Sequence, residues 1–259
     1  MQNSIHAERP DCIASVSRAF DILEYLSYSA TPVGISELSK RFQINRATTY
    51  HLVNSLIAKG YVYRNADRKY LITCRAFELG VAYQNRFPAV HYMKRCNLSF
   101  MSAIPCTCKL AVLTNDLRAL IIYSRSTEDA LVQLQPGYTF PLHTSASGKV
   151  LLAFSQPGVA ERYLENRELT GFTLNTITNK EQFLRELELV RSRGYALDDR
   201  EWSLDQICIA GPVMDRNHNV SALTVSGQAE VVKRHWDRLV HEVLTISRFL
   251  SKELGDLVL

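Results

Sequence analysis

The sequence predicts an α+β protein in which a small N-terminal winged helix-turn-helix domain is joined by a linker helix to a larger C-terminal α/β domain. Two observations carry this prediction. A helix, a tight turn, a second helix and a basic hairpin follow one another within residues 35–72. From residue 89 onward, strands that can pair locally alternate with helical segments. We therefore expect three parts, which are residues 12–72, 73–88 and 89–259.

The N-terminal domain is predicted to begin with two short helices. Apolar residues recur at helical intervals in Ala14–Ser27, and Thr31–Gly34 interrupts that pattern. The next segment, Ile35–Phe42, again has apolar residues at helical spacing and is followed by a turn. Asn45 ends this turn and can accept a hydrogen bond from an unpaired amide of the helix that follows.

The helix predicted over Arg46–Lys59 has two different sides, and Gly60 is placed to end it. At 100° per residue, one side is a stripe suited to a core, and it consists of Thr49, Leu52, Val53, Leu56 and Ile57. The other side carries Ala47, His51, Asn54, Ser55 and Ala58. An ordinary solvated helix would carry Glu and Lys there. Small, neutral, hydrogen-bonding side chains instead favour insertion beside base edges.

A basic hairpin is predicted next, with strands Val62–Arg64 and Lys69–Ile72 joined through residues 65–68. The whole chain has a net charge of only +4, but residues 35–75 contain eight basic and two acidic side chains, a local charge of +6. Residues 91–259 carry 19 basic and 19 acidic side chains and therefore add nothing to the net charge. A positive field concentrated on one small domain attracts nucleic-acid phosphates.

We therefore predict that the N-terminal domain binds double-stranded DNA. The second helix would enter the major groove, while basic side chains of the hairpin and the helix start would contact phosphates. The predicted DNA-binding residues are Arg46, Ala47, Thr48, Tyr50, His51, Asn54, Arg64, Arg68 and Lys69.

The pattern predicts a linker helix over Thr73–Arg86, and Pro88 follows it. In the C-terminal domain, helices are predicted at Val90–Ala103, Ser145–Phe154, Val159–Asn166, Lys180–Arg193 and Val231–Leu254. Strands are predicted at Lys109–Thr114, Ala119–Arg125, Ile207–Met214 and Val220–Ser226, which form two hairpins. The last helix would bury Val232, Trp236, Leu239, Val243, Ile246 and Leu250. Locally paired strands flanked by helices suggest a sensor-like sheet.

Composition is that of an ordinary globular protein, with 46% hydrophobic and 22% charged residues. No apolar run reaches the length of a membrane span, and Met1–Pro10 does not resemble a signal peptide, so we expect a cytoplasmic protein with no membrane partner. The six cysteines lack metal-site spacing. Cys106 and Cys108 would share one face of a strand, which favours small buried residues over a metal or redox site. We expect reduced thiols and no cofactor.

Five fragments occur in the order typical of one family. They are Asn45–Leu52 with Gly60–Val62, Leu142–Ala153, Gly194–Glu201, Cys208–Val213, and Val225–Gly227. Over about residues 14–254 the chain resembles the IclR family of bacterial transcriptional regulators. The resemblance implies an N-terminal winged helix-turn-helix, a linker helix, a C-terminal GAF-like effector-binding domain, and homodimers that often pair into homotetramers.

The resemblance also implies an effector pocket formed by Ala146, Ser147, Asp198, Cys208, Thr224 and Ser226. The resemblance further implies that the effector is a small organic acid, such as a sugar acid or aromatic acid of catabolism. The amide groups that begin the predicted helix after His143 favour a carboxylate, and Thr224 and Ser226 direct their hydroxyls to one side of a strand. Without the resemblance, the residues alone favour a different interpretation, in which Asp198 caps a turn and the two hydroxyls merely decorate a sheet.

The chain departs from the family pattern at three places. His51 occupies a position where the family commonly has Arg, and Ala47 one where it commonly has Ser, so an arginine contact to guanine cannot be carried over. The loop that often contains glycine has the sequence Ser145-Ala146-Ser147 here. The fold therefore transfers more safely than the operator or the effector.

Two alternative functions remain open from the sequence. His143 could act as a general base beside Ser145 or Ser147, with Asp198 as the orienting acid of a hydrolase, although no Gly-x-Ser-x-Gly elbow, phosphate loop or paired-histidine metal motif is present. Alternatively, the C-terminal domain could serve oligomerisation alone, because its long amphipathic final helix suits either purpose. We favour an effector-controlled regulator over an enzyme.

Overall fold

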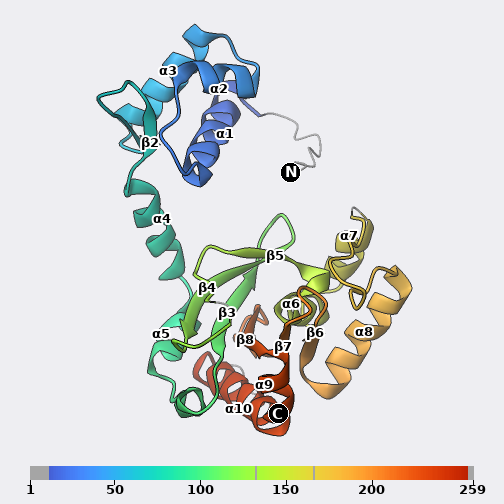
Figure 1. Cartoon of the computed structure of the whole chain (residues 1–259). Helices are drawn as coiled ribbons and strands as arrows, with labels where there is room; N and C mark the ends of the chain where they lie inside the picture. The colour runs from blue at the N-terminus through green and yellow to red at the C-terminus, as the bar shows by residue number, and fades with distance from the viewer. Residues whose placement is uncertain (1–11, 132, 166, 256–259) are drawn as a thin grey trace. The chain divides into compact units, whose positions relative to one another are not determined.

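The computed structural model describes residues 12–131, 133–165 and 167–255, and the chain divides into two compact units, Met1–Gln84 and Asn85–Leu259 (Figure 1). The expectation for Met1–Pro10 therefore lies outside the described residues, as do Asn166 at the end of one predicted helix and residues 256–259. Each unit is built around its own hydrophobic core.

The first unit is a winged helix-turn-helix, as predicted. Its elements are α1 (Ala14–Tyr28), α2 (Ile35–Phe42), α3 (Arg46–Ala58), β1 (Val62–Arg64), β2 (Tyr70–Ile72) and α4 (Arg75–Gln84). The two strands form an antiparallel wing, and Val33 adds an isolated bridge to Tyr70. The predicted hairpin strand that began at Lys69 begins one residue later.

Local sequence explains the corner between α2 and α3. Gln43 adopts a left-handed conformation with φ 53° and ends α2. The side chain of Asn45 then accepts a hydrogen bond of 2.8 Å from the amide of Thr48, which caps α3 as expected. Thr49 and Val53 are buried in the core, whereas His51 is exposed. The predicted two-sided character of α3 is therefore confirmed.

The helix α4 is shorter than the predicted Thr73–Arg86 and belongs to the first unit. It buries none of its residues, and Phe77 is 73% exposed. The hydroxyl of Thr73 donates to the carbonyl of Gly60, and the carboxylate of Glu78 pairs with Arg75 at 2.6 Å at the start of the helix. Phe77 and Leu79 are thus exposed apolar side chains that a partner could cover.

The second unit is a six-stranded antiparallel sheet covered by helices on both faces (Figure 1). Its strands are β3 (Thr107–Leu113), β4 (Arg118–Ser126), β5 (Thr139–Pro141), β6 (Ala196–Asp199), β7 (Gln206–Met214) and β8 (Val220–Gln228). Its helices are α5 (Pro88–Arg95), η1 (Ser99–Ser102), η2 (Leu142–Thr144), α6 (Ala146–Ala153), α7 (Val159–Glu165), α8 (Lys180–Arg193), α9 (Ala229–Arg234) and α10 (Trp236–Glu253). The strand order is β5-β4-β3-β8-β7-β6.

The two faces of the sheet have different characters. Large apolar residues such as Leu110, Leu223 and Val225 lie on one face and pack in a core cluster with residues of α5 and α10. The other face carries small residues, among them Ala210 and Ala222, which leave room for the buried helix α6. Because alternate residues of a strand share a face, the register sets which polar side chains lie beneath α6.

The second unit differs from the prediction at one helix and at two strands. The single helix predicted at Val90–Ala103 is instead α5 followed by the short helix η1. Cys96 is extended, and the side chain of Asn97 accepts from the amide of Ser99, a local turn that competes with helix continuation. The strands β5 and β6 were not predicted, because each is short and neither alternates clearly between polar and apolar residues.

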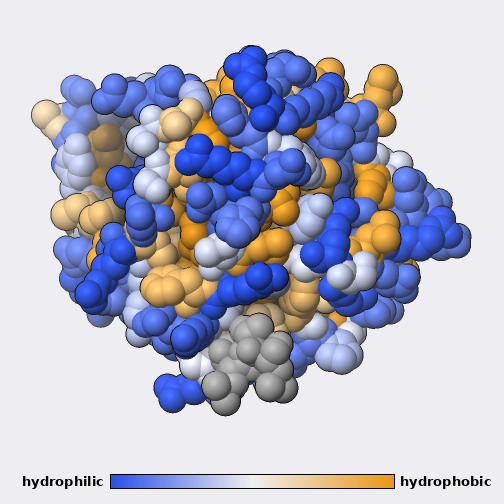
Figure 2. Space-filling view, turned by 90° about the horizontal axis from the view of Figure 1, so that it is seen from below, coloured by the Kyte–Doolittle hydropathy of each residue, from blue (hydrophilic) through white to orange (hydrophobic). Residues whose placement is uncertain are grey.

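The predicted closing helix Val231–Leu254 is also interrupted. It is divided into α9 and α10 at His235, which has non-helical backbone angles and whose amide is shared between the carbonyls of Val231 and Val232. Of the six residues expected on its buried side, five are buried and Trp236 is partly buried against the same core. The face shown in Figure 2 intersperses hydrophilic and hydrophobic side chains. Among the described residues, no helix is long and apolar enough to cross a membrane.

Candidate DNA interface and effector cavity

The first unit has a hollow of about 530 Å³ between the start of α3 and the wing. Six of the nine predicted DNA-binding residues line it, and they are Arg46, Ala47, Tyr50, His51, Arg64 and Arg68. Helix and wing residues that are far apart in the sequence therefore contribute to one surface. Such a hollow can accept a nucleic-acid backbone while α3 contacts the groove beside it.

The other three predicted residues lie outside this hollow. The amide of Thr48 is used by the Asn45 cap and its side chain is half-buried, as is Asn54 farther along α3. Lys69 is exposed in the wing turn, where its amide binds the side chain of Asn65. These positions leave Lys69 able to reach a phosphate, whereas Thr48 contributes mainly to helix initiation.

The hollow is positively charged, because its described lining contains three arginines and no carboxylate. Among the described residues, no carboxylate forms an ion pair with Arg46, Arg64 or Arg68, although other arginines of the chain do form such pairs. Arg68 lies in the turn between β1 and β2, where its backbone is left-handed with φ 60°. Three unpaired guanidinium groups on one concave surface favour an anionic partner.

The second unit contains a cavity of about 170 Å³ between the small-residue face of the sheet and the start of α6. It is lined by Lys109, Leu134, Phe140, Ser145, Ala146, Ser147, Asp198, Trp202, Ser203, Gln206, Cys208 and Thr224. Five of the six predicted effector-binding residues are among them. The exception is Ser226, which is buried beside the cavity and donates a hydrogen bond to the carbonyl of Thr107 at 3.4 Å.

The start of α6 is open toward this cavity. The hydroxyl of Ser145 accepts from the amide of Gly148 at 3.1 Å and caps the helix. The first amides of a helix have no partner within the helix, and those of Ala146 and Ser147 have no recorded acceptor among the described residues. They provide a positive end of the helix dipole at the cavity wall.

Asp198 closes another side of the cavity. Its carboxylate accepts hydrogen bonds from the amides of Glu201 at 2.8 Å and Trp202 at 3.3 Å, so it also holds the loop after β6. Burial raises the pKa of Asp198 above its usual value, although these amides and the Lys149 charge oppose the shift. The turn-capping role left open by the sequence is therefore present, and it coexists with a place in the cavity lining.

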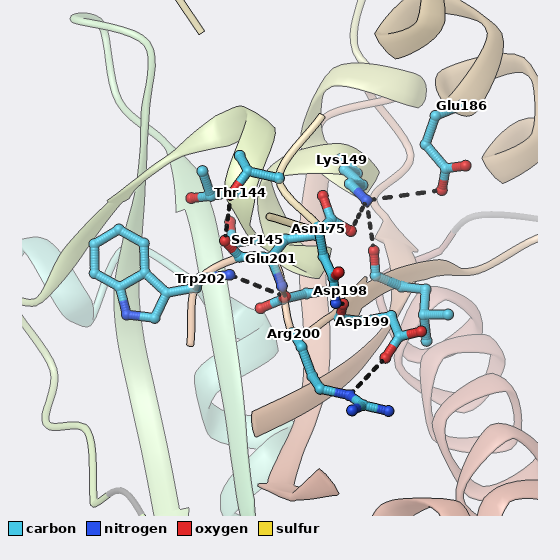
Figure 3. A network of polar contacts seen from close by, with 12 residues as sticks. Thr144, Ser145, Lys149, Asn175, Glu186, Asp198, Asp199, Arg200, Glu201 and Trp202 are labelled. Carbon is cyan, nitrogen blue, oxygen red and sulfur yellow. Dashed lines mark hydrogen bonds and ion pairs between the residues drawn. The ribbon is translucent and has the colours of Figure 1, made fainter. Parts of the chain in front are cut away.

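Behind the cavity lies a network of buried charges (Figure 3). The ammonium group of Lys149, which is 1% exposed, donates to Glu201 at 2.5 Å and to the carbonyl of Leu197 at 2.7 Å. It also lies 3.8 Å from Glu186, which pairs with Arg193. Burial raises the pKa of Glu201, and the adjacent Lys149 opposes that shift. This network fixes α6 to the loop that carries Trp202.

Several lining residues were not identified from the sequence. Lys109 is a charged residue inside the apolar run Cys106–Leu113, which is a signal that the sequence did contain. Phe140 and Trp202 form an aromatic wall with ring centroids 5.4 Å apart. They lie on segments for which no element was predicted, so nothing in the periodicity pointed to them.

The structure does not bring together the groups of the alternative hydrolase. The Nδ1 of His143 lies 2.7 Å from the hydroxyl of Tyr163, and its Nε2 lies 3.0 Å from the carbonyl of Thr170. Since a carbonyl only accepts, Nε2 carries the proton and Nδ1 accepts from Tyr163. Both ring nitrogens are thus occupied by groups other than Ser145 or Ser147, and His143 serves to fix a loop.

This arrangement predicts a pH dependence of stability. Burial lowers the pKa of His143 below 6.5, so the unfolded state binds more protons than the folded state just below that pH. The stability that neutral His143 contributes is therefore present above pH 6.5 and is lost as the pH falls. We expect urea unfolding to give a smaller stability difference between wild type and His143→Gln at pH 5.5 than at pH 7.5. An equal difference at both values would contradict this assignment.

Comparisons with known proteins agree with the two units. The family "IclR helix-turn-helix domain" matches residues 15–66, and "Bacterial transcriptional regulator IclR C-terminal" matches residues 82–252. The chain belongs to the IclR family. It is 32% identical to the transcriptional regulator KdgR of Dickeya chrysanthemi over 258 residues, which cover 96% of this chain and 82% of the relative.

Solved structures of the IclR family have the same fold. The IclR of Thermotoga maritima matches with a TM-score of 0.69 and 29% identity, covering 92% of this chain and 98% of that one. An IclR homolog of Microbacterium hydrocarbonoxydans complexed with 4-hydroxybenzoate matches with a TM-score of 0.77 over 93% and 99% of the chains. Its identity of 20% shows the fold alone. This chain is thus a DNA-binding transcriptional regulator, and its relatives are named as regulators rather than enzymes.

Proposed function

We propose that this regulator binds operator DNA as a homodimer and that a small organic acid bound in the cavity of its second unit controls the DNA affinity. The carrying observation is the cavity beneath α6, which combines unpaired helix amides with a polar lining. A cytoplasmic location follows from this function. The 4-hydroxybenzoate named for the homolog is also a carboxylate, which supports an acid as the effector class.

DNA recognition would use the hollow between α3 and the wing. In this proposal α3 enters the major groove with His51 toward base edges, while Arg46, Arg64 and Arg68 contact phosphates. In the dimer, the first unit of each protomer would bind one half-site, and the two half-sites would lie in successive turns of the duplex.

A second copy of the chain would cover the exposed apolar side chains of the first unit. On α1, Val16 is 48% exposed and Phe20 is 60% exposed, and on α4 Phe77 and Leu79 are exposed. Exposure of these apolar side chains to water is unfavourable. They are suited to packing against the equivalent surface of a second protomer. A homodimer, with pairing of dimers into a tetramer, therefore completes the proposal.

Control by the effector requires unequal binding to two states. The two states of the dimer would differ in the distance between its two DNA-binding domains. An acid changes DNA affinity only if it binds more tightly to one of these states than to the other. We assign the linker at residues 73–88, which contains α4, as the transmitter. In the alternative function, the second unit serves oligomerisation alone. That alternative does not explain why the unit contains a polar cavity.

Two substitutions test the DNA contacts by different signatures. Arg64→Ala removes a phosphate contact, so we expect weaker binding to all sequences alike and a shallower dependence of affinity on salt concentration. His51→Ala should instead relax the base preference at one operator position and cost about 1–3 kcal/mol there. Fluorescence anisotropy with operator variants over a salt series measures both. An unchanged salt slope for Arg64→Ala, or a uniform loss for His51→Ala, would refute the assigned role.

Thermal-shift screening of carboxylate metabolites tests the effector part of the proposal. We expect at least one acid to raise the unfolding midpoint, because ligand that binds only the folded state stabilises it. If no acid shifts the midpoint, the second unit serves oligomerisation alone.

A further inference from the structure

We infer that Lys109 is the residue that binds the carboxylate group of the effector and restricts the effector to acids with a single carboxylate. This inference rests on the proposed acid effector and deepens it. Lys109 lies in the middle of β3 among buried residues, and only 4% of it is exposed. A lysine in such a place is costly unless its ammonium group has an anionic partner.

The described part of the chain does not supply that partner. Among the described residues, no carboxylate forms an ion pair with Lys109, and its Nζ lies 5.5 Å from the centroid of the Phe140 ring. The other buried lysine provides a comparison, because Lys149 is bound by a carboxylate and a carbonyl. The same fold thus satisfies one buried ammonium group completely and leaves the other at the cavity wall.

A second unpaired polar group lies directly beside Lys109. In the register of β3 and β8, Lys109 is opposite Thr224, so both side chains are on the same face of the sheet. Thr224 is fully buried, and its hydroxyl has no hydrogen-bond partner in the described part of the chain. Both residues line the cavity. An ammonium group and a hydroxyl in this arrangement can each donate to one carboxylate.

The rest of the lining limits the number of acid groups. Among the described lining residues, Asp198 is the only other charged one. It is on β6, which β8 and β7 separate from β3. Three strand spacings place the two backbones about 14 Å apart. A second carboxylate reaching that end would face Asp198, whereas hydroxyl or carbonyl groups could bind Gln206 and Ser203. A volume of about 170 Å³ restricts the occupant to a small acid.

The experiment compares wild type with Lys109→Met and Thr224→Val as full-length chains. The probes are acetate, gluconate and 4-hydroxybenzoate, with acetamide, gluconamide and 4-hydroxybenzamide as uncharged counterparts and glucarate as a diacid. Binding is followed by thermal shift and by tryptophan fluorescence in a Trp236→Phe background, so that Trp202 in the cavity wall is the only reporter.

We expect wild type to bind at least one monocarboxylate and neither its amide nor the diacid. Lys109→Met should weaken that binding about thirtyfold or more, because it removes one partner of a buried charged hydrogen bond. Thr224→Val should weaken it by about fivefold. Equal affinity of wild type and Lys109→Met for the acid would overturn the inference while leaving the acid effector intact.

The unfolding midpoint of the ligand-free protein gives a second, independent readout. Because Lys109→Met replaces an unpaired buried cation by an apolar chain of similar length, we expect the unfolding midpoint of the free protein to rise. A purely structural lysine would give a fall, as we expect for Lys149→Met, and a fall would overturn the inference. If wild type binds none of the acids, the acid effector itself fails and the role of Lys109 in binding it fails too.

Discussion

Replacing Gly148 by alanine is expected to destabilise the second unit by about 3 kcal/mol, near the upper end of the cost of overpacking a core. Gly148 is in the first turn of α6, directly against η2. A β-carbon there would lie 2.6 Å from the carbonyl carbon of Leu142 and closer still to its Cα and oxygen. The obstacle is backbone, which cannot rotate away as a side chain could. Either η2 or the start of α6 must shift, and the cavity wall would shift with it.

Urea unfolding measures this effect cleanly. Both tryptophans, Trp202 and Trp236, are in the second unit, so intrinsic fluorescence reports on that unit. The matched control is Gly171→Ala, because a β-carbon at Gly171 meets its nearest atom at an ordinary 3.4 Å, and we expect a change within about 0.5 kcal/mol. A Gly148→Ala protein as stable as wild type would mean that α6 does not approach η2 as closely as described.

The second large effect is expected for Lys149→Met. The substitution removes the cation that neutralises buried Glu201, so we expect a loss of about 3–5 kcal/mol. One oxygen of Glu201 already lacks a hydrogen-bond partner in the described part of the chain, so it has no substitute for the lost bond. The loop with Trp202 would loosen as well, which should change the fluorescence of the folded protein.

A double variant separates the pair from its surroundings. Lys149→Met with Glu201→Met removes both charges and should recover most of the lost stability, because Glu186 keeps its pair with Arg193 and Asp198 keeps its two amide donors. The exposed pair of Arg185 and Glu181, 2.8 Å apart on α8, is the control, and Arg185→Met should cost less than about 0.5 kcal/mol. If Lys149→Met costs no more than Arg185→Met, the network does not hold the cavity wall.

The first unit was more predictable from sequence than the second, and the reason is local chemistry. The turn before α3 is defined by Asn45, whose side chain makes the cap within three residues of itself. The end of α3 is defined by Gly60, which has φ 78°. Both signals act over short distances and so are visible in the sequence. The hollow of the DNA interface then follows once helix and wing pack together.

The cavity of the second unit depends on contacts between distant segments. Phe140 meets Trp202, and Lys109 meets Thr224, only because the strand order brings β3, β8 and the loop after β6 to one place. Residue patterns predicted the two hairpins but not the order of the strands in the sheet. The resemblance to the IclR family supplied five of the twelve lining residues. The unpaired state of Lys109 could be found only from the register and the burial.

The central claim is that an acid in this cavity controls how tightly the first unit holds DNA. The most direct measurement is the affinity of the full-length protein for DNA upstream of its own gene, determined by anisotropy over a salt series with and without an acid found to bind. We predict salt-dependent binding whose dissociation constant changes when the acid is added to wild type but not when it is added to Lys109→Met. Absence of DNA binding even at low ionic strength, or an affinity that the bound acid leaves unchanged, would contradict the account.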